Sequence, residues 1–269
     1  MRRLKILFYW LFVSKNNVSL KELIYFIFKP TIGSYANKVI QSCNLAGDEY
    51  IVKFNNTPHT LFWPKKYSLT NLQQIISETF DSKDWHFYQK EHTTIESGEI
   101  ILDIGTAEGL FPLTVIDKCT KVIIVEPNKI FIKSLKKSFS NYLDKVEILN
   151  YAVGNQSGVI NFSEDSLEGQ VTADCNNQIQ IEKIDNLIPQ DQKISYLKAD
   201  IEGFELEMLK GAAETIKRNK PKIAITTYHK ENDYKEMILL IKSFVPEYKY
   251  YYKGIYEEEP KPVMLHFWI

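Results

Sequence analysis

The sequence is poor in cysteine, with only Cys43, Cys119 and Cys175 among its 269 residues. The three are widely separated, odd in number and without the spacing of metal ligands. This excludes a disulfide framework and a cysteine-based zinc site. We therefore expect reduced thiols and a cytoplasmic location.

An excess of charge of one sign is also absent, because the formal net charge is −1. Proteins that bind nucleic acids usually carry a basic excess or a basic stripe, and the cluster of Lys133, Lys136 and Lys137 fits the solvated face of a helix better. We expect no nucleic-acid partner.

Long hydrophobic runs are missing as well. The apolar run at residues 6–13, which follows Arg2, Arg3 and Lys5, is too short to span a bilayer, and residues 14–17 offer no signal-peptide cleavage site. Together with the apolar residues 23–28, this run predicts core helices, which is the more common case. The alternative is a weak peripheral contact with the inner face of an anionic membrane, because cations beside apolar residues suit an interfacial helix.

What is present is typical of a globular protein: 44% of the residues are hydrophobic and 25% are charged. The length allows one sizeable core and a small additional region. We predict an N-terminal cap region at residues 1–87, with a hairpin at 50–64 and a helix at 69–80, and a main domain at 88–269.

The most informative stretch is residues 100–109, with the sequence IILDIGTAEG. Branched apolar residues favour a buried strand, and Gly105 and Gly109 permit backbone conformations that a Cβ would obstruct. A second apolar strand at residues 122–125 ends in Glu126, whose carboxylate can accept hydrogen bonds from two ribose hydroxyls. The pair predicts a nucleotide-type ligand.

The ligand is better matched by S-adenosylmethionine than by a dinucleotide. Ala107 stands where the dinucleotide fingerprint has its second glycine, which argues against a nicotinamide dehydrogenase. Asp103, two residues before Gly105, suits a cationic ligand better than a diphosphate.

From residue 99 onward, apolar strands alternate with helical patterns, which predicts a parallel sheet covered by helices on both faces. The last two strands, at 248–252 and 263–268, have a short connection and must pair antiparallel.

These elements resemble the α/β, Rossmann-like seven-stranded sheet of class I methyltransferases, with its terminal antiparallel hairpin. More narrowly, residues 88–269 are similar to the FkbM methyltransferase family. The resemblance is carried by the motifs LDIGTAEG (102–109), VEPN (125–128), YAVG (151–154), IDNL (184–187), LKADIEGFE (197–205), LKGA (209–212) and KPKI (220–223). Thr106 departs from the usual alanine, and Thr226 and Thr227 stand where an acid often ends the fifth strand.

The resemblance implies an S-adenosylmethionine-dependent O-methyltransferase that acts on a hydroxyl of a sugar, glycan or related natural product. The alternative is a non-catalytic module with the cofactor fold, a scaffold in glycan assembly. The sequence does not define the oligomeric state. The predicted cofactor-binding residues are Asp103, Gly105, Thr106, Gly109, Glu126, Pro127 and Ala152.

The predicted catalytic residues are Asp200, Glu202 and His229, which follow the fourth and fifth strands. If the chain stays extended, Asp200 and Glu202 project to one side. His229 is the expected general base, because an ordinary imidazole pKa lies near neutrality. A divalent cation held by these three residues is the rival arrangement. Glu205 is expected only to complement a helix dipole.

Overall fold

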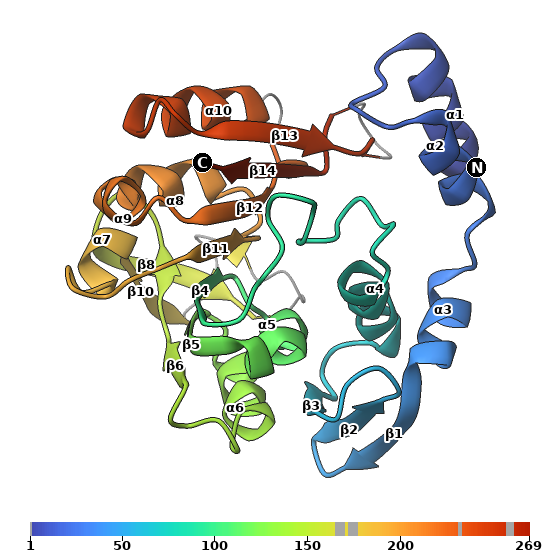
Figure 1. Cartoon of the computed structure of the whole chain (residues 1–269). Coiled ribbons are helices and arrows are strands. Elements are labelled where there is room, and N and C mark those ends of the chain that lie inside the picture. Colours follow the sequence, from blue (N-terminus) through green and yellow to red (C-terminus); the bar gives the residue numbers. More distant parts are fainter. Residues whose placement is uncertain (1, 165–169, 172–176, 231–232, 257–260) are drawn as a thin grey trace.

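The protein is described as a computed structural model, which covers residues 2–164, 170–171, 177–230, 233–256 and 261–269. Figure 1 shows a large sheet with helices on both faces and an N-terminal region along one side. Cys175 lies outside the described residues. Within them, no helix is long and apolar enough to cross a membrane.

The large sheet has seven strands in the order β13-β14-β12-β11-β4-β5-β6. All neighbours pair in parallel except β14, which runs antiparallel to both β12 and β13. The predicted sheet and its terminal hairpin are confirmed. The strands are β4 (Glu99–Ile104), β5 (Cys119–Val125), β6 (Val146–Leu149), β11 (Tyr196–Ala199), β12 (Lys222–Thr226), β13 (Lys249–Lys253) and β14 (Met264–Trp268).

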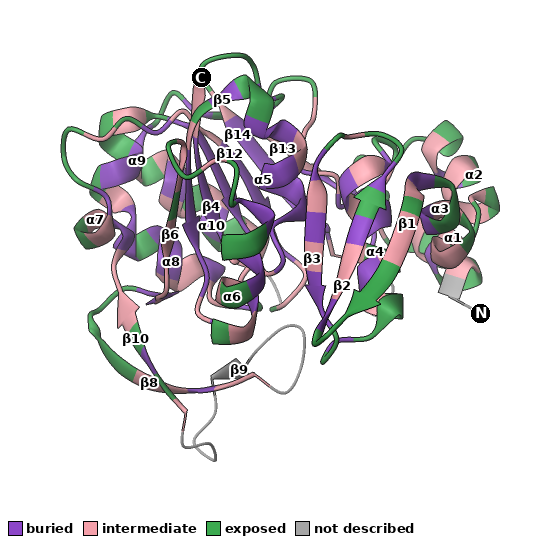
Figure 2. Ribbon diagram, turned by 90° about the horizontal axis from the view of Figure 1, so that it is seen from below, coloured by how far each residue is buried: buried purple, intermediate pink, exposed green. Residues whose placement is uncertain are grey.

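Both faces of this sheet are buried, because its central strands alternate between two apolar clusters. Ile101 belongs to the cluster with α5 and α6, while Leu102 belongs to the cluster with α8, α9 and α10. Figure 2 shows most residues of the central strands as buried. The covering helices are α5 (Leu110–Val115), the 3-10 helix η1 (Ile116–Lys118), α6 (Lys129–Ser138), α7 (Ile184–Leu187), α8 (Glu205–Gly211), α9 (Ala213–Asn219) and α10 (Asp233–Phe244).

A second, smaller sheet lies between β6 and α7 in the sequence. Its strands run in the order β7-β10-β8-β9, with β8 antiparallel to β10. These strands are β7 (Ala152–Val153), β8 (Gly158–Ser163), β9 (Gln170–Val171) and β10 (Gln178–Glu182).

The N-terminal region is a helical hairpin, a third helix, a three-stranded antiparallel sheet and one further helix, in this order. The predicted hairpin exists as β2 and β3 and gains β1 as a third strand. The predicted helix is α4, which Ser68 caps by accepting a hydrogen bond from the Asn71 amide. The elements are α1 (Arg2–Phe12), α2 (Leu20–Phe28), α3 (Ile32–Val39), β1 (Ile40–Ala46), β2 (Glu49–Phe54), β3 (Thr60–Pro64) and α4 (Leu69–Phe80).

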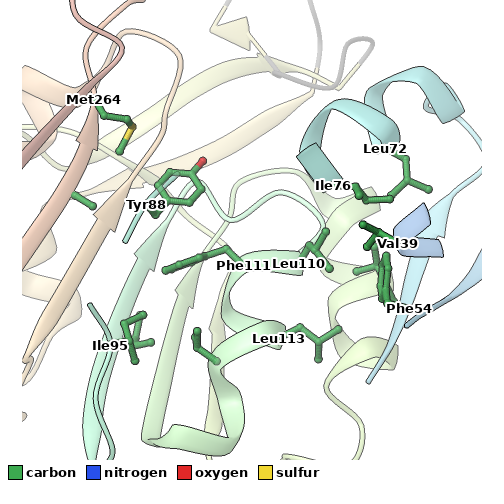
Figure 3. Close-up of a cluster of buried hydrophobic side chains, with 14 of the residues drawn as sticks. Val39, Phe54, Leu72, Ile76, Tyr88, Ile95, Leu110, Phe111, Leu113 and Met264 are labelled. Atoms are coloured by element: carbon green, nitrogen blue, oxygen red, sulfur yellow. The ribbon is translucent and has the colours of Figure 1, made fainter. Parts of the chain in front are cut away.

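The N-terminal region shares one hydrophobic core with the large sheet. Figure 3 shows Phe54 and Ile76 beside Leu110 and Leu113 of α5. Polar contacts cross the same boundary, since the Phe62 amide donates to Ser138 Oγ at 3.0 Å. The N-terminal region is therefore packed against the large sheet and its helices.

Candidate active site

A cavity of about 370 Å³ opens at the carboxyl ends of the parallel strands, where ligands bind in open α/β sheets. The loops after β4, β5 and β11 supply three of its walls, and α4 of the N-terminal region supplies a fourth through Gln74, Ile75, Glu78 and Thr79. The predicted placement of a cap beside the cofactor site is consistent with this wall. Of the predicted cofactor residues, those that line the cavity are Gly105, Thr106, Glu126, Pro127 and Ala152.

Gly105 allows the loop after β4 to pass directly against the end of β11. Its φ is +68°, and a Cβ there would lie 2.0 Å from the backbone oxygen of Asp200. Any side chain at this position would force the two strand ends apart. The glycine thus brings the loop after β4 next to the predicted catalytic residues.

Gly109 has a different role from the one predicted. It does not line the cavity; it precedes α5 with a φ of +85°, and a Cβ there would lie 2.5 Å from Leu135 Cδ2. Its bare backbone lets α5 pack against α6. The sequence pattern could not separate this packing role from ligand contact.

Asp103 also has a different role from the one predicted. Its side chain is fully buried and lies 3.2 Å from Lys198 Nζ, outside the cavity lining. Burial alone would lower the pKa of Lys198, but Asp103 and Asp200 outweigh burial and raise it. The Lys198 ammonium also donates to the Gly105 carbonyl at 2.7 Å. Asp103 therefore holds the loop through a buried ion pair.

Glu126 joins the two loops that frame this end of the cavity. One carboxylate oxygen accepts from the Ala107 amide and the other from the Asn128 amide, each at 2.8 Å. Burial raises the pKa of Glu126 to about 7, even though both amide hydrogen bonds favour the ionised form. The carboxyl group lies where the sequence predicted it, at the tip of β5.

The predicted catalytic residues converge at the other end of the cavity, although not through an extended strand. Strand β11 ends at Ala199, and Glu202 has a φ of +55°, so the chain turns instead of continuing. His229 Nε2 lies 3.0 Å from Glu202 Oε2 and 3.8 Å from Asp200 Oδ1. The turn brings both carboxylates to one imidazole.

Glu205 lies in the first turn of α8, as predicted for a helix-dipole acid, and it also belongs to the same cluster. It is 1% exposed, and His229 Nδ1 lies 2.7 Å from its Oε1. Thr226 Oγ1 lies 3.2 Å from the same oxygen and 3.1 Å from Asp200 Oδ1. The threonine at the end of β12 thus contacts two acids of the cluster, where the family often has an acid.

The reason given for His229 as general base does not hold. Burial alone would lower the pKa of His229, but hydrogen bonds with Glu202 and Glu205 and the charge of Asp200 raise it to about 11. The imidazole is therefore protonated at neutral pH: its Nδ1 donates to Glu205, and its Nε2 forms an ion pair with Glu202. An ordinary imidazole pKa, assumed from the sequence, ignored the three acids that surround it.

Sequence reasoning missed a set of residues just before β4. The Tyr88 hydroxyl donates to Asp200 Oδ2 at 2.8 Å, and His86 Nε2 lies 3.6 Å from the same oxygen and 3.3 Å from the Tyr228 hydroxyl. Burial opposes ionisation of Asp200, yet His86, Lys198 and His229 together lower its pKa. The Tyr88 ring packs against Phe111, with the ring centroids 5.0 Å apart, and its hydrogen bond to Asp200 depends on the tertiary structure.

The cluster also has the composition of a cation site. Ligand atoms of Asp200, Glu205 and His229 all lie within 4.8 Å of one another. Glu205 takes the place that the sequence gave to Glu202. Carboxylate and imidazole ligands suit several divalent metals.

The fold and the position of the site define the class I methyltransferase architecture. A model of the methyltransferase FkbM domain matches residues 103–252, and the chain belongs to this family. The FkbM methyltransferase of Methylobacillus flagellatus KT shares 21% sequence identity, with a TM-score of 0.54, over 76% of this chain and 56% of that one. This chain thus spans little more than half the length of that relative.

Two other solved structures have a lower sequence identity and a lower TM-score. The M. jannaschii tRNA m1G37 methyltransferase is 14% identical, with a TM-score of 0.46, over 95% of this chain and 68% of that one. Spermidine synthase from Thermotoga maritima is 12% identical, with a TM-score of 0.42, over 85% of this chain and 72% of that one. No curated protein matches the sequence.

Proposed function

We propose that this chain is an S-adenosylmethionine-dependent O-methyltransferase that acts on a hydroxyl of a sugar, glycan or related natural product. One observation carries the proposal: a single cavity joins the glycine loop and Glu126 at one end to Asp200 and Glu202 at the other. Membership of the FkbM family supports methyl transfer. The acceptor class rests on the resemblance to that family.

The charge of the cavity supports a cationic cofactor. Five carboxyl groups line it, and the one cation among its described lining residues, Lys198, is matched by the buried Asp103. Burial raises the pKa of Glu108 and Glu126 to about 7, but the pKa of Asp200 is lowered, so the lining still favours a ligand with sulfonium and ammonium groups over a diphosphate. When bound, S-adenosylmethionine supplies a methyl group on positively charged sulfur. The lining carboxyl groups belong to Glu78, Glu108, Glu126, Asp200 and Glu202.

The residues that would hold this cofactor contribute in different ways. Gly105 leaves the backbone bare beside the cavity, and Glu126 presents a carboxyl group for hydroxyl hydrogen bonds at the tip of β5. Thr106, Pro127 and Ala152 complete this end of the cavity.

Asp200 is the proton acceptor in this proposal, and His229 is a positioning residue. As the methyl carbon would pass from sulfur to the hydroxyl oxygen, with the carbon–sulfur bond breaking, the hydroxyl would become strongly acidic, so the Asp200 carboxylate would be basic enough to accept its proton. Asp200 lines the cavity and is held ionised by His86, Lys198 and His229. The protonated His229 fixes Asp200, Glu202 and Glu205 relative to one another.

The test has two stages. Calorimetry of the purified full chain with S-adenosylmethionine, and with NAD as the competing ligand, measures cofactor choice. Transfer of a labelled methyl group to a panel of activated sugars and cell-envelope glycans then measures activity. Cofactor binding with transfer to a hydroxyl supports the proposal. Preference for NAD, or no binding by folded protein, contradicts it, and tight binding without transfer across the panel supports the scaffold alternative.

A cation-assisted form of the same reaction is the second candidate. It is favoured by the 4.8 Å grouping of Asp200, Glu205 and His229. A divalent cation there would acidify the acceptor hydroxyl. Activity that a chelator abolishes and that magnesium or manganese restores would establish this form, while full activity in the chelator would exclude it.

A further inference from the structure

Helices α1 and α2 form an antiparallel hairpin at one corner of the molecule, as Figure 1 shows. The Arg3 guanidinium donates to the carbonyls of Ile27 and Lys29, at 2.6 and 2.7 Å. At the other end of the hairpin, Trp10 Nε1 donates to the Val18 carbonyl at 2.6 Å. The start of α1 is therefore fixed beside the end of α2.

One side of the hairpin is anchored to the rest of the protein. Ile6 and Leu23 are buried in the shared core. The Tyr25 hydroxyl donates to Asp81 at 2.7 Å, and the Phe26 ring stacks on Trp85 with the ring centroids 4.2 Å apart. These contacts confirm the predicted core helices for one side of each helix and fix which side remains outward.

The outward side is apolar. Exposed residues recur on one stripe of α1 at the spacing i, i+4, i+7, i+8 and on one stripe of α2 at i, i+4, i+8. Phe12 is 73% exposed and Phe28 is 78% exposed. We name this surface the α1–α2 apolar face. Its members are Leu4, Phe8, Leu11, Phe12, Leu20, Ile24 and Phe28.

This concentration is unusual for a protein surface. Single exposed apolar residues need no explanation, but a contiguous set marks an interaction site. Eight of the fifteen large apolar side chains that are exposed within the described residues fall between residues 4 and 28. The rest are scattered over the molecule, among them Leu239 on α10.

The charge around this face has one sign. Residues 1–47 contain seven Lys and Arg residues and a single acid, in a chain whose formal net charge is −1. That acid, Glu22, accepts from the Ser19 amide at 2.8 Å and pairs with Lys253 at 2.5 Å. Lys5, Lys15 and Lys21 remain exposed on the hairpin. The segment is cationic, and the remainder of the chain is acidic.

We propose that the α1–α2 apolar face docks on the surface of an anionic lipid bilayer. An apolar stripe flanked by exposed lysines is the pattern of a helix that lies in the membrane interface. The two helices have 11 and 9 residues, so they can lie on the bilayer but cannot cross it. The charge asymmetry favours an anionic surface over a second copy of this chain, because two such faces would repel each other.

Vesicle sedimentation of the full chain tests the docking. We compare vesicles of phosphatidylcholine with 30% phosphatidylglycerol against pure phosphatidylcholine, at low and high salt. We expect binding to the anionic vesicles at low salt, and a loss of about tenfold or more in high salt or on neutral vesicles, because salt screens the lysines. Protein that stays in the supernatant with anionic vesicles at low salt overturns the proposal.

A pair of variants separates docking from folding. Phe12→Asp with Phe28→Asp removes two exposed rings and adds charge of the wrong sign, so binding should fall about tenfold or more. Leu239→Asp, at a site 71% exposed on α10, is the matched control and should bind like the wild type. Circular dichroism and S-adenosylmethionine calorimetry check that both variants fold. Equal binding by the double variant and the wild type overturns the proposal, as does a wild-type dimer that the double variant dissociates.

Discussion

The two ends of the cavity are built in different ways. At the β4–β5 end, Gly105 to Glu108 form one loop and Glu126 to Asn128 another, so each group of lining residues is contiguous in the sequence. At the β11–β12 end, the cluster gathers Tyr88, Asp200 with Glu205, and His229 from three separate segments. The lining residues of the first end could therefore be predicted from sequence motifs. The second depends on how distant segments pack.

The largest expected effect is at Gly105, where the loop after β4 lies against the end of β11. Gly105→Ala should lower the free energy of unfolding by roughly 4 kcal/mol or more and abolish cofactor binding, because its Cβ would lie 2.0 Å from the Asp200 carbonyl oxygen. Denaturant unfolding and calorimetry measure both. Gly98→Ala is the control: its φ is +89° but nothing lies within 4 Å of its Cβ, so it should cost only about 1–2 kcal/mol. Equal losses would mean that the close approach of the strands is unimportant.

Asp200→Asn tests the acceptor end alone. It should lower kcat by roughly two to four orders of magnitude, because the amide cannot accept the proton, while cofactor affinity stays near that of the wild type. Steady-state kinetics and calorimetry separate the two. Full activity in this variant would remove Asp200 from the proposed mechanism.

His229 should stabilise the acid cluster in a pH-dependent way. Its folded pKa, about 11, lies above the unfolded value of 6.5, so its contribution is complete below pH 6.5 and is lost as the pH rises through 11. His229→Gln should lower stability by roughly 3 kcal/mol at pH 7, because three acids lose their cation, and the difference should shrink toward pH 11.

Unfolding in urea at a series of pH values measures this difference, and NMR titration of the His229 ring measures the pKa directly. A ring that titrates near pH 6.5 would restore His229 as a candidate base.

Glu126→Ala tests the β4–β5 end with a smaller effect. It should weaken S-adenosylmethionine binding by roughly 1.5–3 kcal/mol, the scale of hydrogen bonds to a charged group, measured by calorimetry. Glu126→Gln is the conservative comparison, because it keeps an acceptor oxygen. Unchanged affinity in Glu126→Ala would exclude the predicted ribose contact.

Tyr88→Phe has the smallest expected effect, about 1 kcal/mol, or several-fold in kcat, because one hydrogen bond to Asp200 is lost. The Tyr88 hydrogen bond helps to lower the pKa of Asp200, so the acidic limb of the pH–rate profile should move to higher pH. Tyr250→Phe, at an exposed site on β13, is the control. An unchanged profile in Tyr88→Phe would separate Tyr88 from the acceptor.

Local signals in the sequence are enough to predict the sheet, its terminal hairpin, helix α4 and the positions of Gly105 and Glu126. Each of these depends on local signals: apolar periodicity, capping residues and strand-to-loop motifs act over a few residues. The sequence also indicated that Asp200, Glu202 and His229 lie together, because the carboxyl ends of adjacent parallel strands share one edge.

The roles of these residues depend on how the chain packs. Lys198 neutralises Asp103, Leu135 of α6 fills the space that Gly109 leaves, and Glu205 faces His229 instead of solvent. The pKa of His229 and the hydrogen bond from Tyr88 to Asp200 follow from the same packing. Burial and the distance between charges set these properties, and both depend on segments far apart in the chain.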